Sequence, residues 1–145
     1  MRVVLDTNSI VSGLLWHGPP RSILDLARAG KLELFTSPTL LAELHEVLSR
    51  PKFAARLAAA GTTAHELATG YAALATPIRA EPERGAVPED PDDDHVLGCA
   101  IAAAVNWIIS GDSHLLRIGD YQEVRIGSAR DFLQANPLFE ETSDD

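Results

Sequence analysis

The sequence is poor in the features that mark secreted, membrane-spanning and zinc-binding proteins. It holds one cysteine, Cys99, which has no second thiol with which to form a disulfide inside the chain. No run approaches the roughly 18 apolar residues of a membrane span, and the first residues lead directly into a strand pattern. The histidines do not show the spacing of a zinc site. We therefore expect a cytoplasmic protein with no signal peptide and no membrane partner.

Common catalytic motifs and positive charge are scarce as well. The sequence has no G-x-S-x-G, no P-loop and no G-x-G-x-x-G, and Cys99 lies in an apolar stretch that favours a core role over a nucleophilic one. Twelve basic residues against 21 acidic ones give a net charge of −9, unlike the basic surface of a general nucleic-acid binder. A nuclease that acts through bound cations must itself carry clustered carboxylates, however, so the net charge leaves this class open.

The sequence does contain a regular alternation of strand and helix patterns. Strands are predicted at residues 2–5, 32–36, 77–80, 107–110 and 124–126. Helices are predicted at residues 20–29, 38–48, 52–76 with a break at Gly61, 93–105, 113–118 and 128–135. This order predicts an α/β fold, a three-layer α/β/α sandwich around a mostly parallel sheet of four to five strands. We expect one domain over residues 1–136 and a flexible acidic tail over residues 137–145.

Four carboxylates are placed where they can meet at one edge of this sheet. Asp6 follows the first strand, Asp112 follows the strand that ends at Ser110, Asp94 opens the buried helix before that strand, and Glu43 lies in an otherwise apolar helix. Ligands of open parallel sheets bind at the carboxyl ends of the strands. Crowded carboxylates repel one another unless a cation neutralises them, and Mg²⁺ and Mn²⁺ prefer oxygen ligands. The sequence therefore predicts a centre for Mg²⁺ or Mn²⁺.

Each of these acids also has an alternative role in local structure. An aspartate after a strand is often a turn or cap residue, which applies to Asp6 and to Asp112. One of the three consecutive acids at 92–94 is expected to cap the helix that they open. Glu46 lies one turn beyond Glu43 and is an alternative to it. The joint placement of the acids, rather than any one of them, carries the prediction.

Several short motifs occur together in an order that resembles the PIN-domain family. They lie at residues 3–8, 12–20, 37–48, 50–53, 90–97 and 110–116. They are most similar to the branch that contains the toxins of toxin–antitoxin pairs. The resemblance covers most of the chain, and the ordered set is far more specific than the opening Asp-Thr-Asn alone.

The resemblance implies a metal-dependent ribonuclease and assigns its site residues. The family's acidic positions, which bind metal and carry the catalysis, fall on Asp6, Glu43, Asp94 and Asp112. Asn8 and Ser110 match the polar positions that support the first and last acids. Asp93 matches a further acid of this branch, so the choice between Asp93 and Asp94 stays open; we prefer Asp94 because it directly precedes the apolar part of the helix. His114 stands where relatives often carry an acid.

The implied activity is hydrolysis of RNA phosphodiester bonds with Mg²⁺ or Mn²⁺, leaving 5′-phosphate and 3′-hydroxyl ends. Arg50, Lys52 and Arg56 form a basic cluster that is expected to track the RNA backbone, although a solvated helix face explains them equally well. The resemblance also implies an antitoxin protein as partner, and a homodimer.

Three other functions fit parts of the sequence. Two of them are a non-catalytic PIN-like module that binds an antitoxin and a housekeeping RNA-processing nuclease. A phosphate-transfer enzyme with an aspartate nucleophile after the first strand usually has a second acid two residues later, and Asn8 occupies that position here.

Overall fold

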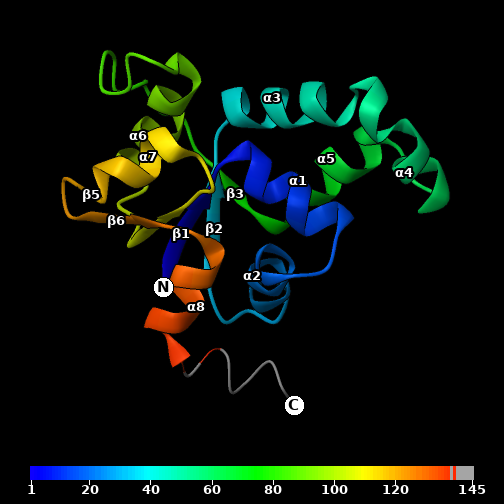
Figure 1. The fold of residues 1–145 in the computed structure, drawn as a ribbon, viewed down its shortest axis with the longest axis horizontal. Helices are drawn as coiled ribbons and strands as arrows, with labels where there is room; N and C mark the ends of the chain where they lie inside the picture. The colour runs from blue at the N-terminus through cyan, green and yellow to red at the C-terminus, as the bar shows by residue number, and fades with distance from the viewer. Residues whose placement is uncertain (138, 140–145) are drawn as a thin grey trace.

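A six-stranded, mostly parallel sheet forms the centre of the molecule (Figure 1). The structure is a computed structural model that describes residues 1–137 and 139. The strands are β1 (Arg2–Leu5), β2 (Glu33–Thr36), β3 (Thr76–Pro77), β4 (Trp107–Ile109), β5 (Asp120–Tyr121) and β6 (Val124–Gly127). They are arranged in the order β3-β2-β1-β4-β6-β5, and β5 alone is antiparallel to its neighbour.

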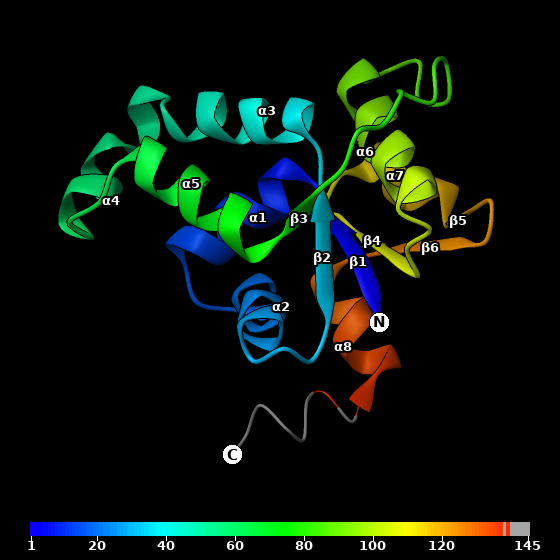
Figure 2. The ribbon, with the colours of Figure 1, turned by 180° about the vertical axis from the view of Figure 1, so that it is seen from behind.

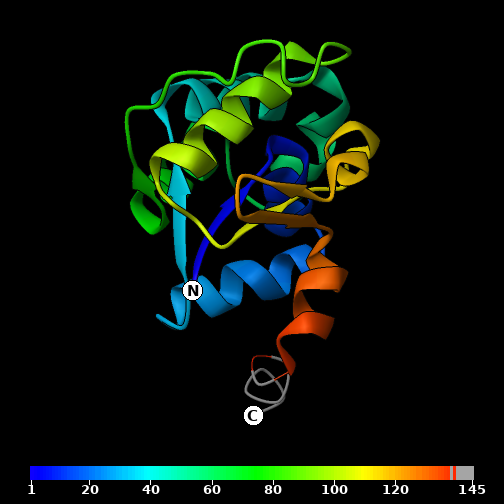
Figure 3. The ribbon, with the colours of Figure 1, turned by 90° about the vertical axis from the view of Figure 1, so that its left-hand side faces the viewer.

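Helices cover both faces of the sheet, which confirms the predicted three-layer architecture. They are α1 (Thr7–Leu15), α2 (Pro19–Arg28), α3 (Pro38–Leu48), α4 (Ala54–Ala59), α5 (Ala64–Leu74), α6 (Pro91–Ala102), α7 (Ser113–Ile118) and α8 (Ala129–Ala135), with a 3₁₀ turn at Pro51–Phe53. Helices α6 and α7 pack on one face, and α1, α2, α3, α5 and α8 pack on the other (Figure 2). Figure 3 views the molecule from the side of α6 and α7.

Alternation along the strands divides the core between the two faces. Val3 and Leu5 of β1 pack with α1, α2 and α3, whereas Val4 between them packs with α6. Strand β4 repeats this pattern, with Ile109 on the first face and Ile108 on the second. Successive side chains of a strand point to opposite faces, so a strand with helices on both sides is apolar throughout.

Helix α1 was not predicted, and its packing explains why. Its small residues read as a loop, but one of them is required by the neighbouring helix. A Cβ atom on Gly13 would lie 2.8 Å from Leu24 Cδ1 and 3.0 Å from the carbonyl oxygen of Pro20. The close approach of α1 and α2 therefore requires glycine at position 13. Glycine has a low helix propensity, so the sequence of α1 did not predict a helix.

The sheet also has one strand more than the four to five that were predicted. The additional strand, β5, is two residues long and is joined to β6 by a two-residue turn. Gln122 and Glu123 in this turn have positive φ angles of 46° and 71°. Asparagine and glycine are the usual residues in such turns, so the sequence carried no sign of a hairpin. The strand predicted at residues 77–80 differs as well: the observed strand β3 covers only Thr76–Pro77.

The described chain has no helix that is both long and apolar enough to cross a membrane. The flexible tail predicted for residues 137–145 lies outside the described residues, apart from 137 and 139.

Candidate metal centre

The candidate site lies where β1 and β4 end side by side. The two strands pair in parallel through Leu5 and Ile109, and the backbone N–H of Asp6 extends this pairing by donating to the Ile109 carbonyl at 3.1 Å. The chain leaves β1 into α1 and leaves the β4 end into α7. Neighbouring strands of an open α/β sheet whose connections run to opposite sides leave a crevice at their carboxyl ends. Asp6 and Asp112 lie at this crevice.

Both of these aspartates are also helix caps. One Asp6 carboxylate oxygen accepts from the backbone N–H of Ser9 at 2.9 Å at the start of α1. One Asp112 oxygen accepts from the backbone N–H of His114 at 2.7 Å at the start of α7. The capping role that the sequence suggested for these acids is therefore present. A carboxylate has about four acceptor positions and each cap occupies one of them, so both side chains keep oxygen lone pairs for other partners.

The Ser110 hydroxyl joins the two aspartates. It donates to the second oxygen of Asp6, and it accepts from the backbone N–H of Asp112 at 2.9 Å. Ser110 is buried, so this link is shielded from water. Asn8, the other residue expected to support Asp6, is exposed on the first turn of α1, and no hydrogen bond joins it to Asp6 among the described residues.

Helix α6 brings Asp93, and not the preferred Asp94, to these acids. The Asp94 carboxylate accepts from the backbone N–H groups of Gly85 at 3.1 Å and Val87 at 2.8 Å, so it is directed at the loop before the helix. Asp93 lies beside Asp112. Adjacent residues of an α-helix point about 100° apart, and here Asp93 lines the crevice while the Asp94 carboxylate is held by the loop. The expected placement of Asp94 is corrected in this respect.

A small acidic cavity results from this arrangement, with a volume of about 60 Å³. It is lined by Asp6, Thr7, Asn8, Glu43, Asp90, Asp92, Asp93, Val96 and Asp112. A volume of this size has room for more than one water molecule. Over the part of the chain that the structure describes, the lining contains no lysine or arginine. Three of the four predicted acids, Asp6, Glu43 and Asp112, thus line the same cavity, together with Asp93.

Burial raises the pKa of several of these carboxyl groups. It raises the pKa of Asp6, which is almost fully enclosed, and that of the half-buried Glu43. The pKa of Asp93 is raised well above its usual range, first by burial and then by the nearby charges of Asp112 and Asp90. Desolvation and like charge both disfavour the ionised form. A cation in the cavity would remove the second of these costs.

Two buried polar atoms in the cavity wall have no hydrogen-bond partner within the described residues. They are the Oδ2 atom of Asp93 and the Oγ1 atom of Thr7, and both residues are more than nine-tenths buried. Buried polar groups are nearly always paired, with protein, water or a ligand. Unpartnered oxygens among ionisable carboxylates fit a hard dication and its waters, so the residues present fit a metal ion.

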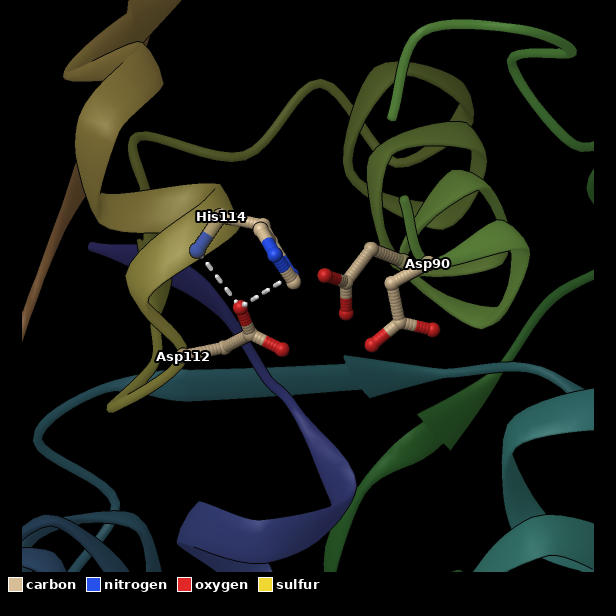
Figure 4. A group of neighbouring side chains, drawn as sticks. Asp90, Asp112 and His114 are labelled. Carbon is tan, nitrogen blue, oxygen red and sulfur yellow. Dashed lines mark hydrogen bonds and ion pairs between the residues drawn. The ribbon is translucent and has the colours of Figure 1, made fainter. Parts of the chain in front are cut away.

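Asp90, Asp93, Asp112 and His114 form a second grouping at the edge of this cavity. Each offers one donor atom, and the four atoms lie within 4.8 Å of one another (Figure 4). Asp90 and His114 were not among the predicted site residues. The spacing of Asp90 and Asp93 was the available signal, because residues three apart lie on the same face of a helix.

A family model described as "PIN domain" matches residues 2–114 of the chain. The chain belongs to the PIN-domain family. PIN domains are generally metal-dependent nucleases, and membership implies an RNA substrate. Comparison with curated proteins and with solved structures gave no match.

Beside the acidic cavity, this PIN domain has a larger one of about 360 Å³. It is lined by Asn8, Ser9, Ser12, Pro19, Pro20, Ser110, Gly111, Ser128, Ala129 and Arg130. Asn8 lines both cavities, so they are neighbours across the first turn of α1. Arg130 is exposed and is the one cationic residue of this lining within the described chain.

The predicted basic cluster of the PIN domain lies at the far end of α3, beside α4 (Figure 1). Arg50 forms an ion pair with Glu46 at 3.0 Å, and Arg56 donates to the carbonyl oxygen of Leu15 at 2.9 Å. The Lys52 ammonium lies 5.1 Å from the centre of the Phe53 ring. None of the three lines either cavity as the structure describes them.

Proposed function

We propose that this protein is an endoribonuclease that hydrolyses RNA phosphodiester bonds with a divalent cation, Mg²⁺ or Mn²⁺, held by Asp6, Glu43, Asp93 and Asp112. The observation that carries the proposal is the acidic cavity, with its carboxylates, its unpartnered oxygens and no basic residue in its described lining. Family membership supports the same class of reaction.

The chain's own residues have distinct tasks in this proposal. A bound dication would supply an activated water and neutralise charge on the scissile phosphate and the leaving oxygen. Ser110 orients the Asp6 carboxylate through one hydrogen bond and holds the backbone at Asp112 through a second. The cap at Ser9 fixes the other oxygen of Asp6. Such support keeps metal-binding side chains in place before the ion arrives.

We propose that the RNA strand runs through the larger cavity toward the acids. This cavity adjoins the acidic one at Asn8, and its lining offers hydroxyl groups and the guanidinium of Arg130, which suit phosphate and sugar oxygens. The cluster of Arg50, Lys52 and Arg56 is the competing path. Two of its members already have protein partners, which favours the cavity beside Arg130.

The nuclease proposal is tested by metal titration followed by cleavage. Mn²⁺ is titrated into metal-free protein in a calorimeter, and the loaded protein is incubated with end-labelled single-stranded RNA. We expect saturable Mn²⁺ binding and fragments that appear only with metal and carry 5′-phosphate ends. Asp93→Asn should bind Mn²⁺ more weakly and cleave far more slowly, while Asp25→Asn, on the exposed face of α2, should change neither property. Absence of Mn²⁺ binding at millimolar concentration overturns the proposal. Binding without cleavage of any RNA favours the non-catalytic binding module.

We further propose a toxin role, with an antitoxin as protein partner and a homodimer as the assembled form. The ordered motifs that resemble the toxin branch support both points. Induced expression should arrest growth, and co-expression of a DNA-binding protein encoded beside this chain's gene should relieve the arrest. Normal growth under induction favours the housekeeping RNA-processing nuclease. A monomer by light scattering at micromolar concentration contradicts the dimer.

A further inference from the structure

The imidazole of His114 lies at the edge of the acidic cavity, beside Asp90, Asp93 and Asp112, without a structural role that accounts for its position. Its Nδ1 atom is 3.4 Å from Oδ1 of Asp112, and it is fully buried with no hydrogen-bond partner among the described residues. The cap of α7 uses the backbone N–H of His114, at 2.7 Å from the same Asp112 oxygen, and does not need the ring. Any residue other than proline would supply that N–H.

The ring is directed at the acids, and the side chain remains 31% exposed. One nitrogen of His114 and one oxygen each of Asp90, Asp93 and Asp112 lie within 4.8 Å of one another, and Figure 4 shows the ring on the same side as the carboxylates. Asp93, which shares this grouping, is more than nine-tenths buried and has an unpartnered oxygen. A buried imidazole nitrogen and a buried carboxylate oxygen, both without partners, can be satisfied by a single cation.

We propose that His114 is a metal ligand of this centre, and that its nitrogen donor biases the centre toward first-row transition ions, Co²⁺ and to a smaller degree Mn²⁺, over Mg²⁺. The inference rests on the proposed metal-dependent nuclease and adds a ligand to it. Imidazole binds transition metals well, whereas Mg²⁺ strongly prefers carboxylate and water oxygens. Aspartate at position 114 would give a centre of oxygen donors alone. This position therefore sets which metal the chain selects.

Pulsed electron paramagnetic resonance of bound Mn²⁺ tests the inference without measuring activity. A directly bonded imidazole gives a ¹⁴N coupling to the Mn²⁺ electron spin, and an oxygen-only centre does not. We expect this coupling in the parent and in His65→Ala, which removes an exposed histidine of α5. We expect its loss in His114→Ala and His114→Asp at full Mn²⁺ occupancy.

Calorimetry of the same proteins gives a second measure. Relative to the parent, His114→Asp should lower the ratio of Mn²⁺ to Mg²⁺ affinity by about tenfold or more, the scale on which changes around a bound metal act. Saturable Mn²⁺ binding by the parent without a ¹⁴N coupling, or a coupling that persists in His114→Ala, overturns the role of His114 and leaves the proposed function standing. No Mn²⁺ binding by the parent overturns both.

Discussion

Asp93 and Asp94 are adjacent in α6, yet they lie in two regions that treat a carboxylate in opposite ways. The first is the loop region, the segment before α6 that contains Gly85 and Val87. There the Asp94 carboxylate accepts hydrogen bonds from the backbone N–H groups of these two residues. In the acidic cavity, Asp93 is as deeply buried but faces other acids, and one of its oxygens has no partner in the described chain. Both residues are aspartate, so the difference arises entirely from their surroundings. It shows that burial alone does not leave a carboxylate open to a cation; the backbone N–H groups that reach Asp94 are absent around Asp93 in the described chain.

Exchanging the two aspartates for asparagine should separate these regions most sharply. Asp93→Asn removes an anionic ligand with little change of shape, so cleavage should fall by about a hundredfold or more, comparable to loss of one group that stabilises a transition state. Asp94→Asn should keep most of the cleavage rate. Single-turnover cleavage of labelled RNA at saturating Mn²⁺ measures both. Equal losses in the two variants would remove the distinction between the regions.

The metal response of stability should follow the acidic cavity alone. A ligand that binds only the folded state stabilises it by about 2.7 kcal/mol at a hundred times its dissociation constant. Added Mn²⁺ should therefore raise the melting temperature of the parent and of Asp94→Asn. Calorimetric melting should show most of this shift absent from Asp6→Asn and Asp93→Asn. A parent that melts at the same temperature with and without millimolar Mn²⁺ would contradict the metal centre.

The loop region should respond to substitution by losing stability. In Asp94→Asn, the side-chain amide presents one oxygen and an NH₂ group to the backbone N–H groups of Gly85 and Val87, so one of these donors loses its acceptor, at a cost of up to about 3 kcal/mol. Urea unfolding of the metal-free protein should show this loss. The matched variant Asp25→Asn, which alters an exposed ion pair, should change the free energy of unfolding by less than about 1 kcal/mol.

The two regions should also differ in their dependence on pH. The pKa values of Asp6, Glu43 and Asp93 are raised by burial, so without metal the folded state binds protons more tightly than the unfolded chain. This contribution to stability is complete below the ordinary carboxyl pKa of about 4 and is lost as pH rises through the raised values.

Melting temperatures between about pH 5 and pH 8 in the presence of a chelator test this dependence. The difference in stability between the parent and Asp93→Asn isolates one of the shifted groups: the parent should weaken relative to the variant as pH rises. A difference that is independent of pH would show that the Asp93 carboxyl is not perturbed. Mn²⁺ should oppose the trend in the parent.

The smallest expected effect concerns the path of the RNA. Arg130→Ala should weaken binding of a single-stranded oligonucleotide and reduce the slope of log affinity against log salt by about 0.7, the value for one lost phosphate contact on a single strand. Fluorescence anisotropy with the Asp93→Asn protein measures binding without cleavage. Lys52→Ala serves as the comparison, and a larger effect from Lys52 would place the strand beside α4 instead.

Local signals in the sequence were enough for most of the fold and for part of the site. Ser37 and Pro38 predicted the start of α3, and the Ser37 hydroxyl does accept from the backbone N–H of Leu40 at 3.2 Å. Thr63 similarly caps α5 through the backbone N–H of Glu66. Caps and alternating apolar residues are set within a few positions of the chain, so they can be predicted without knowing the remaining structure.

The rotation of α6 could not be predicted in this way, because residues distant from its first turn fix it. A Cβ atom on Gly98 would lie 2.0 Å from the carbonyl oxygen of Glu81. The segment that precedes α6 therefore packs against the helix at Gly98. In this position, the backbone N–H groups of Gly85 and Val87 in that segment reach Asp94 rather than Asp93. Which of two adjacent aspartates enters the cavity depends on this contact. The pairing of Arg56 with Leu15, 41 residues away, is a second example of non-local control.

The acids of the cavity come from two separate parts of the chain. Asp6 and Glu43 precede β3, whereas Asp90, Asp93 and Asp112 follow it, and the exposed stretch at Arg84 and Gly85 lies between the two groups. A cation in the cavity would therefore cross-link the amino-terminal and carboxyl-terminal portions of the molecule. If the backbone were cut at that stretch, each fragment would hold only part of a ligand set, and complementation between the fragments would depend on the concentration of metal.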